Sequence, residues 1–181
     1  IAGIKASAAV NTGILDYVGE HIAAGMTTNQ IDQMIYDYTV EHGGTPADLD
    51  FEGYPFSVCT SINEVVCHGM PSEDDVLKEG DIVNVDCSTI VDGYFSDSSR
   101  MFCIGEVSSE RQRLVDVTRA SVEAGLAAVK PWLPLSVMAE AVQKTVEDAG
   151  FSVVREYGGH GIGKEFHEDP FVGFTTEAPD V

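Results

Sequence analysis

Positive charge is the scarcest property of this sequence. Its 181 residues include 10 lysines and arginines against 30 aspartates and glutamates, which gives a formal net charge of −20. A surface of this charge repels the phosphates of nucleic acids and the headgroups of anionic lipids. We therefore expect neither nucleic acid nor a membrane as a partner, and the simplest role of the acidic surface is to keep the protein soluble.

Long apolar runs are also missing. No stretch approaches the roughly 18–20 apolar residues that a membrane-spanning helix needs. Hydrophobic residues make up 44% of the chain, which is an ordinary share for a globular protein. The first residues, IAGIKASAAV, contain neither an initiator methionine nor a signal-peptide pattern, so we expect a processed product or a piece of a longer protein.

Cysteine is infrequent, with four residues in the chain. Three of them lie in apolar, strand-like runs, and none forms a close pair with the spacing of a zinc site. Free thiols in a reducing compartment are the better interpretation, and they favour a cytoplasmic location. The four residues are Cys59, Cys67, Cys87 and Cys103.

Hydrophobic periodicity predicts helices at both ends of a central group of strands. Apolar residues at helical spacing cover 4–22, and a second helix follows the cap-like Thr27-Thr28 and stops at Gly43-Gly44. Strands are predicted next, the last two joined through Asp92-Gly93 as a hairpin, over residues 56–62, 81–90 and 94–104. Further on, the patterns predict helices over 110–129 and about 136–149, and a strand over 151–156.

The helical pairs also indicate an internal repeat. A shift of 107 residues lays Val10 on Val117, Leu15 on Val122 and Gly43 on Gly150. A true repeat predicts two similar α+β halves, 1–106 and 107–181, related by a pseudo-twofold axis. The first half contains the Asp-Gly hairpin, whereas the sequence ends before an equivalent hairpin in the second half, so we expect that half to be truncated.

The predicted hairpin brings two aspartates to one face of the sheet. With the turn centred on Asp92-Gly93, Asp86 lies opposite Ser99 and Asp97 lies opposite Ser88. The two aspartates are then diagonal neighbours, roughly 7 Å apart at Cα. In a buried setting, either a cation neutralises such a pair or one carboxylate takes up a proton. The alternative is a solvated face on which both aspartates are ordinary polar residues.

Three histidines are further candidates for chemistry. His160 stands in a glycine-rich run, YGGHGIG, and His167 follows in FHEDP. A histidine beside two carboxylates suits Mn, Fe, Co or Zn, and two such ions can share bridging carboxylates. The glycine-rich run lacks the lysine of a phosphate loop. His68, in SINEVVCHGMP, follows an apolar run and is more often structural in such a place, and the adjacent Cys67 leaves a thiol nucleophile with a histidine base as a weaker alternative.

These segments together resemble the methionine aminopeptidases, specifically the short type I, bacterial-like forms. The resemblance extends over essentially the whole chain and is carried by segments 53–59, 61–71, 80–86, 92–102 and 153–170. It implies the α+β pita-bread fold with pseudo-twofold halves, in a single metallopeptidase domain over 1–181. It also implies removal of the N-terminal methionine from nascent polypeptides, through attack of a metal-bridging hydroxide on the first peptide bond, by a cytoplasmic monomer.

The same resemblance assigns roles to individual residues. Two divalent metal ions (Co, Mn, Fe or Zn) are expected, with Asp86 chelating one, Asp97 bridging both and His160 ligating the second. His68 is expected to contact the substrate, and His167 to hydrogen-bond the peptide carbonyl or the tetrahedral intermediate. An apolar pocket that suits the thioether of methionine is expected from Tyr54, Cys59 and Phe166.

Some family positions are different or absent here. The family completes its site with two glutamates on strands beyond residue 181, so the 181-residue chain alone is expected to lack part of the site. Asp48 stands where bacterial relatives often have a pocket cysteine, and Phe51 where they often have tyrosine. Two alternatives stay open: a non-catalytic or fragment-state pita-bread module that binds peptides, and a proline-directed peptidase of the same fold.

Overall fold

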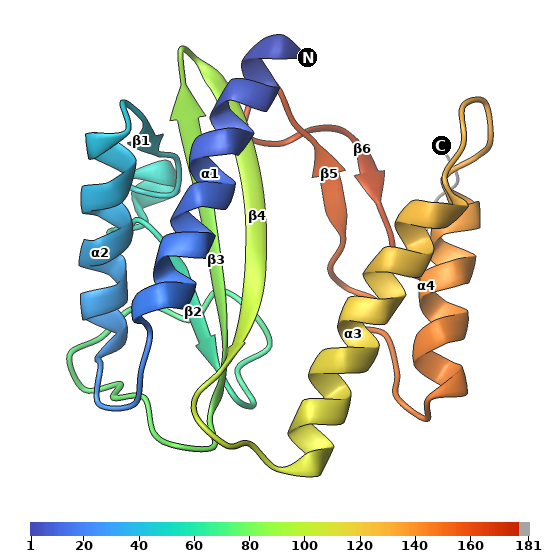
Figure 1. Ribbon diagram of the computed structural model, residues 1–181. Coiled ribbons are helices and arrows are strands. Elements are labelled where there is room, and N and C mark those ends of the chain that lie inside the picture. Colours follow the sequence, from blue (N-terminus) through green and yellow to red (C-terminus); the bar gives the residue numbers. More distant parts are fainter. Residues whose placement is uncertain (178–181) are drawn as a thin grey trace. The chain divides into compact units, whose positions relative to one another are not determined.

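A computed structural model describes residues 1–177, which form two compact units (Figure 1). The first unit comprises residues 1–108 and 162–166, and the second comprises the remaining described residues. No helix among residues 1–177 is both long and apolar enough to cross a membrane.

The first unit is a small antiparallel sheet covered on one face by a helix. Strand β3 (Ile82–Val91) is central, and it pairs with β4 (Tyr94–Cys103) along one edge and with β1 (Thr45–Pro46) and β2 (Cys59–Ile62) along the other. Helix α1 (Ala2–His21) lies on β3 and β4, and α2 (Thr28–Glu41) packs beside α1 (Figure 1). The core between them is aliphatic: Ile14, Leu15, Val18, Ile31, Ile35, Val58, Leu77, Val83, Val85 and Ile104.

The helices of this unit begin and end close to where the sequence predicts. Thr27 caps α2, because its hydroxyl accepts from the Gln30 amide while the Gln30 side chain accepts from the Thr27 amide. This reciprocal arrangement satisfies two backbone donors at the start of the helix. Gly43, with φ of +76°, follows the end of α2. The predicted range 4–22 for the first helix differs from Ala2–His21 by one or two residues at each end.

The predicted hairpin register is confirmed. Asp92 and Gly93 both have positive φ, 51° and 72°, which is the conformation of a two-residue hairpin turn. Asp86 pairs with Ser99, and Asp97 pairs with Ser88. The opposite face of β3 is the one that α1 covers, since the Asn11 amide donates to the side chains of Cys87 and Thr89, at 3.7 and 3.2 Å, and these alternate with Asp86 along the strand.

The second unit contains a helix pair and a short hairpin. Helix α3 (Ser109–Ala128) packs on α4 (Ser136–Asp148), and β5 (Gly159–Gly161) pairs antiparallel with β6 (Glu168–Val172). Because Gly125 has no Cβ, Val142 and Met138 of α4 can approach the backbone of α3 closely. Helices α1 and α3 have the same length of 20 residues and begin at Ala2 and Ser109, which is the shift that the predicted repeat requires.

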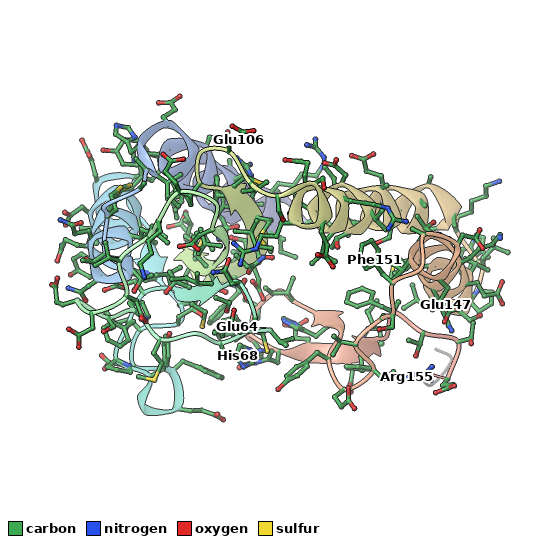
Figure 2. The ribbon with its side chains drawn as sticks, turned by 90° about the horizontal axis from the view of Figure 1, so that it is seen from below. Glu64, His68, Glu106, Glu147, Phe151 and Arg155 are labelled. Carbon is green, nitrogen blue, oxygen red and sulfur yellow. The ribbon has the colours of Figure 1, made fainter. Side chains whose placement is uncertain are left out.

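The predicted strand over 151–156 is wrong. These residues form no strand, and the strands of this region are β5 and β6 instead. Phe151 is labelled in Figure 2. The guanidinium carbon of Arg113 lies 5.0 Å from the centroid of its ring. The apolar run after Gly150 therefore forms no ladder of backbone hydrogen bonds. Its first residue, Phe151, instead packs against Arg113 of α3.

Candidate active site

The sheet face opposite α1 gathers the acidic candidates of the first unit. Asp86 on β3 has Ser99 of β4 on one side and Cys59 of β2 on the other, as direct cross-strand partners. Directly paired residues of antiparallel strands project to the same face. Asp97 is on this face too, through its pairing with Ser88. Asp86 is half-buried and Asp97 is exposed, so this part of the face is open to solvent at one side.

A third carboxylate, Asp48, joins this pair from the loop after β1. Its Oδ2 accepts a hydrogen bond from the Ser88 amide at 2.8 Å. Burial raises the pKa of Asp48 to about 7; the Ser88 amide lowers it in part, and the negative charges of Asp86 and Asp97 raise it further. Asp48 was not among the predicted site residues, because the pattern of a loop does not indicate which strand the loop will face.

Tyr54 and Cys59 lie together beside these carboxylates. The Tyr54 hydroxyl donates to the Val58 carbonyl at 2.9 Å, and the Cys59 thiol donates to the Tyr54 oxygen at 3.4 Å. Burial raises the pKa of the Cys59 thiol to about 11, and the charges of Asp48 and Asp86 add to this although the Tyr54 hydrogen bond opposes it. Cys59 is therefore a neutral, soft group at neutral pH and not a thiolate nucleophile.

Phe166, the third predicted pocket residue, is buried in an aromatic cluster of the first unit. Its ring stacks on Phe95 with centroids 5.6 Å apart and meets the edge of Phe51 at 4.9 Å. Segment 162–166 is held on β4 by a hydrogen bond from the Phe95 amide to the Gly163 carbonyl, 2.9 Å long. Phe95 is two residues before Asp97 on β4, so the cluster lies on the carboxylate face. Alternation along β4 was the signal that could have identified Phe95.

His68 lies in the segment that follows β2 (Figure 2). This segment folds back on the strand, because the Thr60 amide donates to the Gly69 carbonyl at 2.7 Å and the Gly69 amide donates to the Ser61 hydroxyl at 3.1 Å. His68 is exposed and has a φ of +54°, an uncommon conformation for a residue with a side chain. These hydrogen bonds hold the backbone next to His68 against β2.

The histidines of the second unit meet on the β5–β6 hairpin. The rings of His160 and His167 lie edge to face, with centroids 4.5 Å apart. Nδ1 of His160 donates to the Gly161 carbonyl at 2.8 Å, because a carbonyl only accepts. In the neutral ring Nε2 then carries the lone pair, which is the form that ligates a metal ion.

The glycines around His160 have a structural cause of their own. A Cβ on Gly161 would stand 2.2 Å from the Asp169 carbonyl oxygen, and one on Gly158 would stand 2.5 Å from that of Val172. The backbones of β5 and β6 therefore approach more closely than any other residue type allows.

Comparison with known proteins identifies the protein family. The model of metallopeptidase family M24 matches residues 2–180, and the chain belongs to this family. The architecture is the α+β pita-bread fold of its structural neighbours, as predicted. An X-Pro aminopeptidase from Thermotoga maritima shares this fold with a TM-score of 0.79 at 23% identity, over 98% of this chain and 49% of that one.

The more similar relatives are methionine aminopeptidases. The enzyme of Buchnera aphidicola is 45% identical over 173 residues, which cover 95% of this chain and 66% of the relative. The crystal structure of methionine aminopeptidase from Rickettsia prowazekii superposes with a TM-score of 0.91 at 40% identity, over 95% of this chain and 70% of that one. This chain thus spans just under two thirds of the length of the Buchnera relative.

Membership of a metallopeptidase family implies a divalent metal ion as cofactor. Within residues 1–177, no three histidine, cysteine or acidic side chains are grouped closely enough to hold one by themselves. The donor chemistry of the first unit nevertheless fits such an ion. Asp48, Asp86 and Asp97 are close enough for their charges to raise the pKa of Asp48, and a cation relieves this kind of repulsion.

Proposed function

We propose that this chain carries the carboxylate and methionine-binding part of an enzyme that removes N-terminal methionine from new polypeptides. The observation that supports the proposal best is the shared sheet face. Asp86 and the pocket residue Cys59 are direct cross-strand partners, so the acidic groups and the pocket lie side by side. The relatives at 40–45% identity are named for this activity, and the present chain spans about two thirds of their length.

The proposal assigns metal binding to Asp86, Asp97 and His160, with two divalent ions of Co, Mn, Fe or Zn. Carboxylate oxygens with one imidazole nitrogen form a mixed donor set that suits these ions. When bound, such ions polarise a peptide carbonyl and make water more acidic. The Nδ1–H bond of His160 supports its role, since it leaves Nε2 as the ligating atom of the neutral ring.

The remaining roles concern the substrate, the N-terminal peptide of a nascent polypeptide. Cys59 and Tyr54 offer a soft, largely satisfied surface to the thioether, since their polar hydrogens already have acceptors. Phe166 closes an apolar wall with Phe95 and Phe51. His68 contacts the substrate and His167 donates to the peptide carbonyl or the oxyanion that develops from it. A cytoplasmic monomer without nucleic-acid or membrane partners is part of the proposal, and the net charge of −20 supports the absence of nucleic acid and anionic membranes as partners.

The test is metal-dependent cleavage of a Met-Ala-Ser peptide by the full-length protein, assayed with Co, Mn, Fe and Zn in turn. Asp86→Asn and Asp97→Asn should each abolish it, because an amide cannot supply a carboxylate ligand. Asp92→Asn is the matched control, since it changes an exposed aspartate in the turn of the same hairpin and Asn-Gly also suits that turn.

Two outcomes would contradict the proposal. One is the absence of cleavage with all four metals, and the other is unchanged activity in Asp86→Asn and Asp97→Asn. Preferential cleavage of an X-Pro dipeptide would instead favour the proline-directed alternative. A protein that binds the Met-Ala-Ser peptide and cleaves neither substrate would be the non-catalytic module.

A further inference from the structure

Asp48 is a largely buried carboxylate to which the proposed function assigns no role. It follows β1, and the chain is held on β3 there, because the Ala47 amide donates to the Ser88 carbonyl at 2.9 Å and Oδ2 of Asp48 accepts from the Ser88 amide at 2.8 Å. Burial raises the pKa of Asp48, and the negative charges of Asp86 and Asp97 raise it further. Burying a carboxylate beside like charges costs stability, so packing alone does not account for an aspartate at this position.

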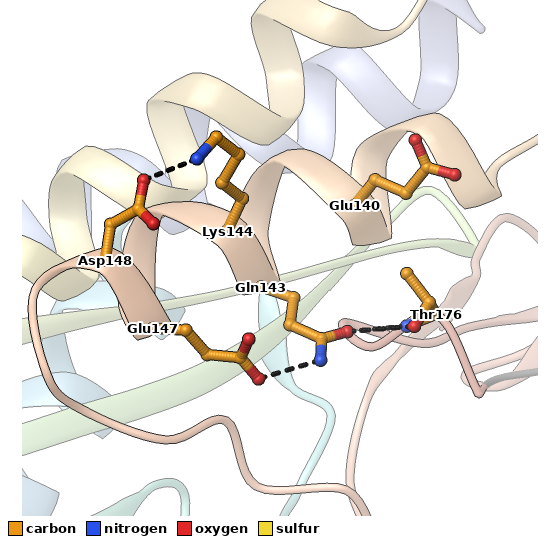
Figure 3. A pocket seen from close by; sticks show the side chains of 6 residues that line it. All are labelled: Glu140, Gln143, Lys144, Glu147, Asp148 and Thr176. Atoms are coloured by element: carbon orange, nitrogen blue, oxygen red, sulfur yellow. Dashed lines mark hydrogen bonds and ion pairs between the residues drawn. The ribbon is translucent and has the colours of Figure 1, made fainter.

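The acidic recess on α4 shows how different the other carboxylates can be. It has a volume of about 440 Å³ and is lined by polar and charged side chains (Figure 3). Its acidic groups are exposed, and two of them have partners, since Lys144 contacts Asp148 at 2.6 Å and Gln143 donates to Glu147 at 2.8 Å. Solvated carboxylates of this kind need no further explanation on an acidic chain, whereas Asp48 does.

The carboxyl group of Asp48 stands beside two residues of the proposed methionine pocket. Burial is the main cause of the raised pKa of the Cys59 thiol, and the charge of Asp48 adds more to it than the charge of Asp86 does. This order holds although Asp86 is the direct cross-strand partner of Cys59. Burial also raises the pKa of the Tyr54 hydroxyl, with smaller contributions from Cys59 and then Asp48. Because electrostatic effects weaken with distance, the Asp48 carboxyl lies near both groups.

The backbone of Asp48 begins the loop that carries further pocket residues. The Phe51 amide donates to the Asp48 carbonyl at 3.0 Å, and the Tyr54 amide donates to the Phe51 carbonyl at 2.9 Å. The Phe51 ring in turn meets the edge of Phe166, with centroids 4.9 Å apart. The bond to the Ser88 amide fixes the start of this loop on β3. One short segment therefore supplies both apolar walls and a carboxyl group to the same place.

A carboxyl group changes which side chain such a pocket suits. The thioether of methionine is at best a weak hydrogen-bond acceptor, so it leaves a carboxyl group that it covers without a good partner. Covering a polar group in this way costs free energy. A primary carboxamide carries two N–H donors and an acceptor oxygen, so it can bond a carboxyl group in either protonation state. Glutamine carries a carboxamide on a side chain about as long as that of methionine.

We propose that Asp48 is a specificity-determining residue, which extends the substrates of this site from N-terminal methionine to N-terminal glutamine. This inference rests on the proposed function, since it concerns the pocket of the same site. The carboxamide donates to the Asp48 carboxyl, while the aliphatic part of the side chain lies against Phe51 and Phe166. A carboxylate has about four acceptor positions, more than the two backbone amides of Ser88 and Asp48 itself occupy.

Charged side chains suit this pocket less well. The ammonium group of lysine would leave water for a surface of rings and a thiol, which is costly for a full charge. Glutamate has nearly the shape of glutamine, and its carboxylate would be repelled by Asp48, Asp86 and Asp97. The pair of glutamine and glutamate therefore tests hydrogen bonding at nearly constant shape.

The experiment compares kcat/KM of the full-length, metal-loaded protein for Met-Ala-Ser, Gln-Ala-Ser, Glu-Ala-Ser and Lys-Ala-Ser. Gln-Ala-Ser should be cleaved, and about 100-fold or more faster than Glu-Ala-Ser. The ratio of kcat/KM for Gln-Ala-Ser to that for Met-Ala-Ser is taken within one preparation, so incomplete folding or metal loading of a variant cancels. Asp48→Cys, which puts a soft and neutral group in place of the carboxyl, should lower this ratio roughly 10- to 100-fold. Asp48→Asn keeps an acceptor oxygen and should lower it less.

Asp32→Asn is the matched control. Asp32 is another partly buried aspartate, which accepts a bond from the Ser57 amide at 2.6 Å and whose pKa burial also raises. Its substitution should leave the ratio unchanged. Failure to cleave any of the four peptides would overturn the proposed function itself. Cleavage of Met-Ala-Ser without Gln-Ala-Ser, an unchanged ratio in Asp48→Cys, or faster cleavage of Lys-Ala-Ser than of Gln-Ala-Ser would overturn this inference alone.

Discussion

Replacing Asp48 with asparagine should change how the stability of the metal-free protein depends on pH. Asp48 is largely buried, and burial together with the charges of Asp86 and Asp97 raises its pKa from 3.8 to about 7. The folded protein therefore holds a proton on Asp48 in a pH range where the unfolded chain has lost it. Stability contributed by this group is complete below the unfolded pKa and is lost as the pH rises through the folded one.

The size of the effect follows from the shift. Each pKa unit corresponds to about 1.4 kcal/mol of unfolding free energy. A rise of the Asp48 pKa from 3.8 to about 7 therefore means that ionised Asp48 lowers the unfolding free energy by at most about 4 kcal/mol, relative to the protonated form. Between about pH 8 and about pH 5, roughly 2–3 kcal/mol of this should be recovered. Asparagine has nearly the same shape and cannot ionise, so Asp48→Asn should lose this part of the pH dependence and be the more stable protein at about pH 8.

The assay is urea unfolding at a series of pH values, with a chelator present to keep cations away from the carboxylates. The difference in unfolding free energy between Asp48→Asn and the unmodified protein isolates Asp48 from the other titrating groups. Asp92→Asn, at the exposed turn, should show no such difference. A constant difference across the pH series would refute the reasoning, because it would mean that Asp48 has similar pKa values in the folded and unfolded states.

Two further changes test the local structure by circular dichroism and thermal unfolding. Gly161→Ala should destabilise the β5–β6 hairpin strongly, because its Cβ would meet the Asp169 carbonyl oxygen at 2.2 Å. Gly159→Ala should be tolerated, because the atom nearest to its Cβ would be 3.6 Å away. Equal effects of the two substitutions would contradict this prediction. Thr27→Ala should cost about 1 kcal/mol, since it removes one half of the capping box with Gln30, and an unchanged unfolding free energy would show that the cap contributes nothing.

The parts of the site that lie on regular structure could be predicted from the sequence. The Asp92-Gly93 turn fixes the register of the hairpin, and the register alone places Asp86 and Asp97 on one face. Asp48 could not be found in this way. It reaches the same face from a loop, and its position depends on one hydrogen bond to the Ser88 amide, 40 residues further along the chain.

The error at 151–156 has a related cause. Phe151, Val153 and Val154 form a short apolar run, and short runs of this kind do not distinguish a strand from an irregular packed segment. A strand also needs a neighbour with free backbone groups. The hairpin partner of β6 is β5 at Gly159–Gly161, where glycines allow the close approach, and the apolar run finds its contacts elsewhere, as Phe151 does under Arg113.

Helices α1 and α3 show most clearly what a periodic pattern does and does not determine. They have equal lengths, as the repeat predicts, yet α1 buries Ile14, Leu15 and Val18 while the apolar residues Val122 and Leu126 of α3 are 51% and 67% exposed.

The difference lies in the partner of each helix. A sheet of several strands covers a broad stripe of α1, and polar bonds such as that of Asn11 to the Cys87 carbonyl fix its position. Within residues 1–177, the main partner of α3 is the single helix α4, and a helix covers only a narrow stripe. Ser121 and Gly125 are the buried residues of α3, and the close approach of Met138 and Val142 requires position 125 to lack a Cβ. The pattern thus sets the length of a helix, and its neighbours decide which of its faces becomes the core.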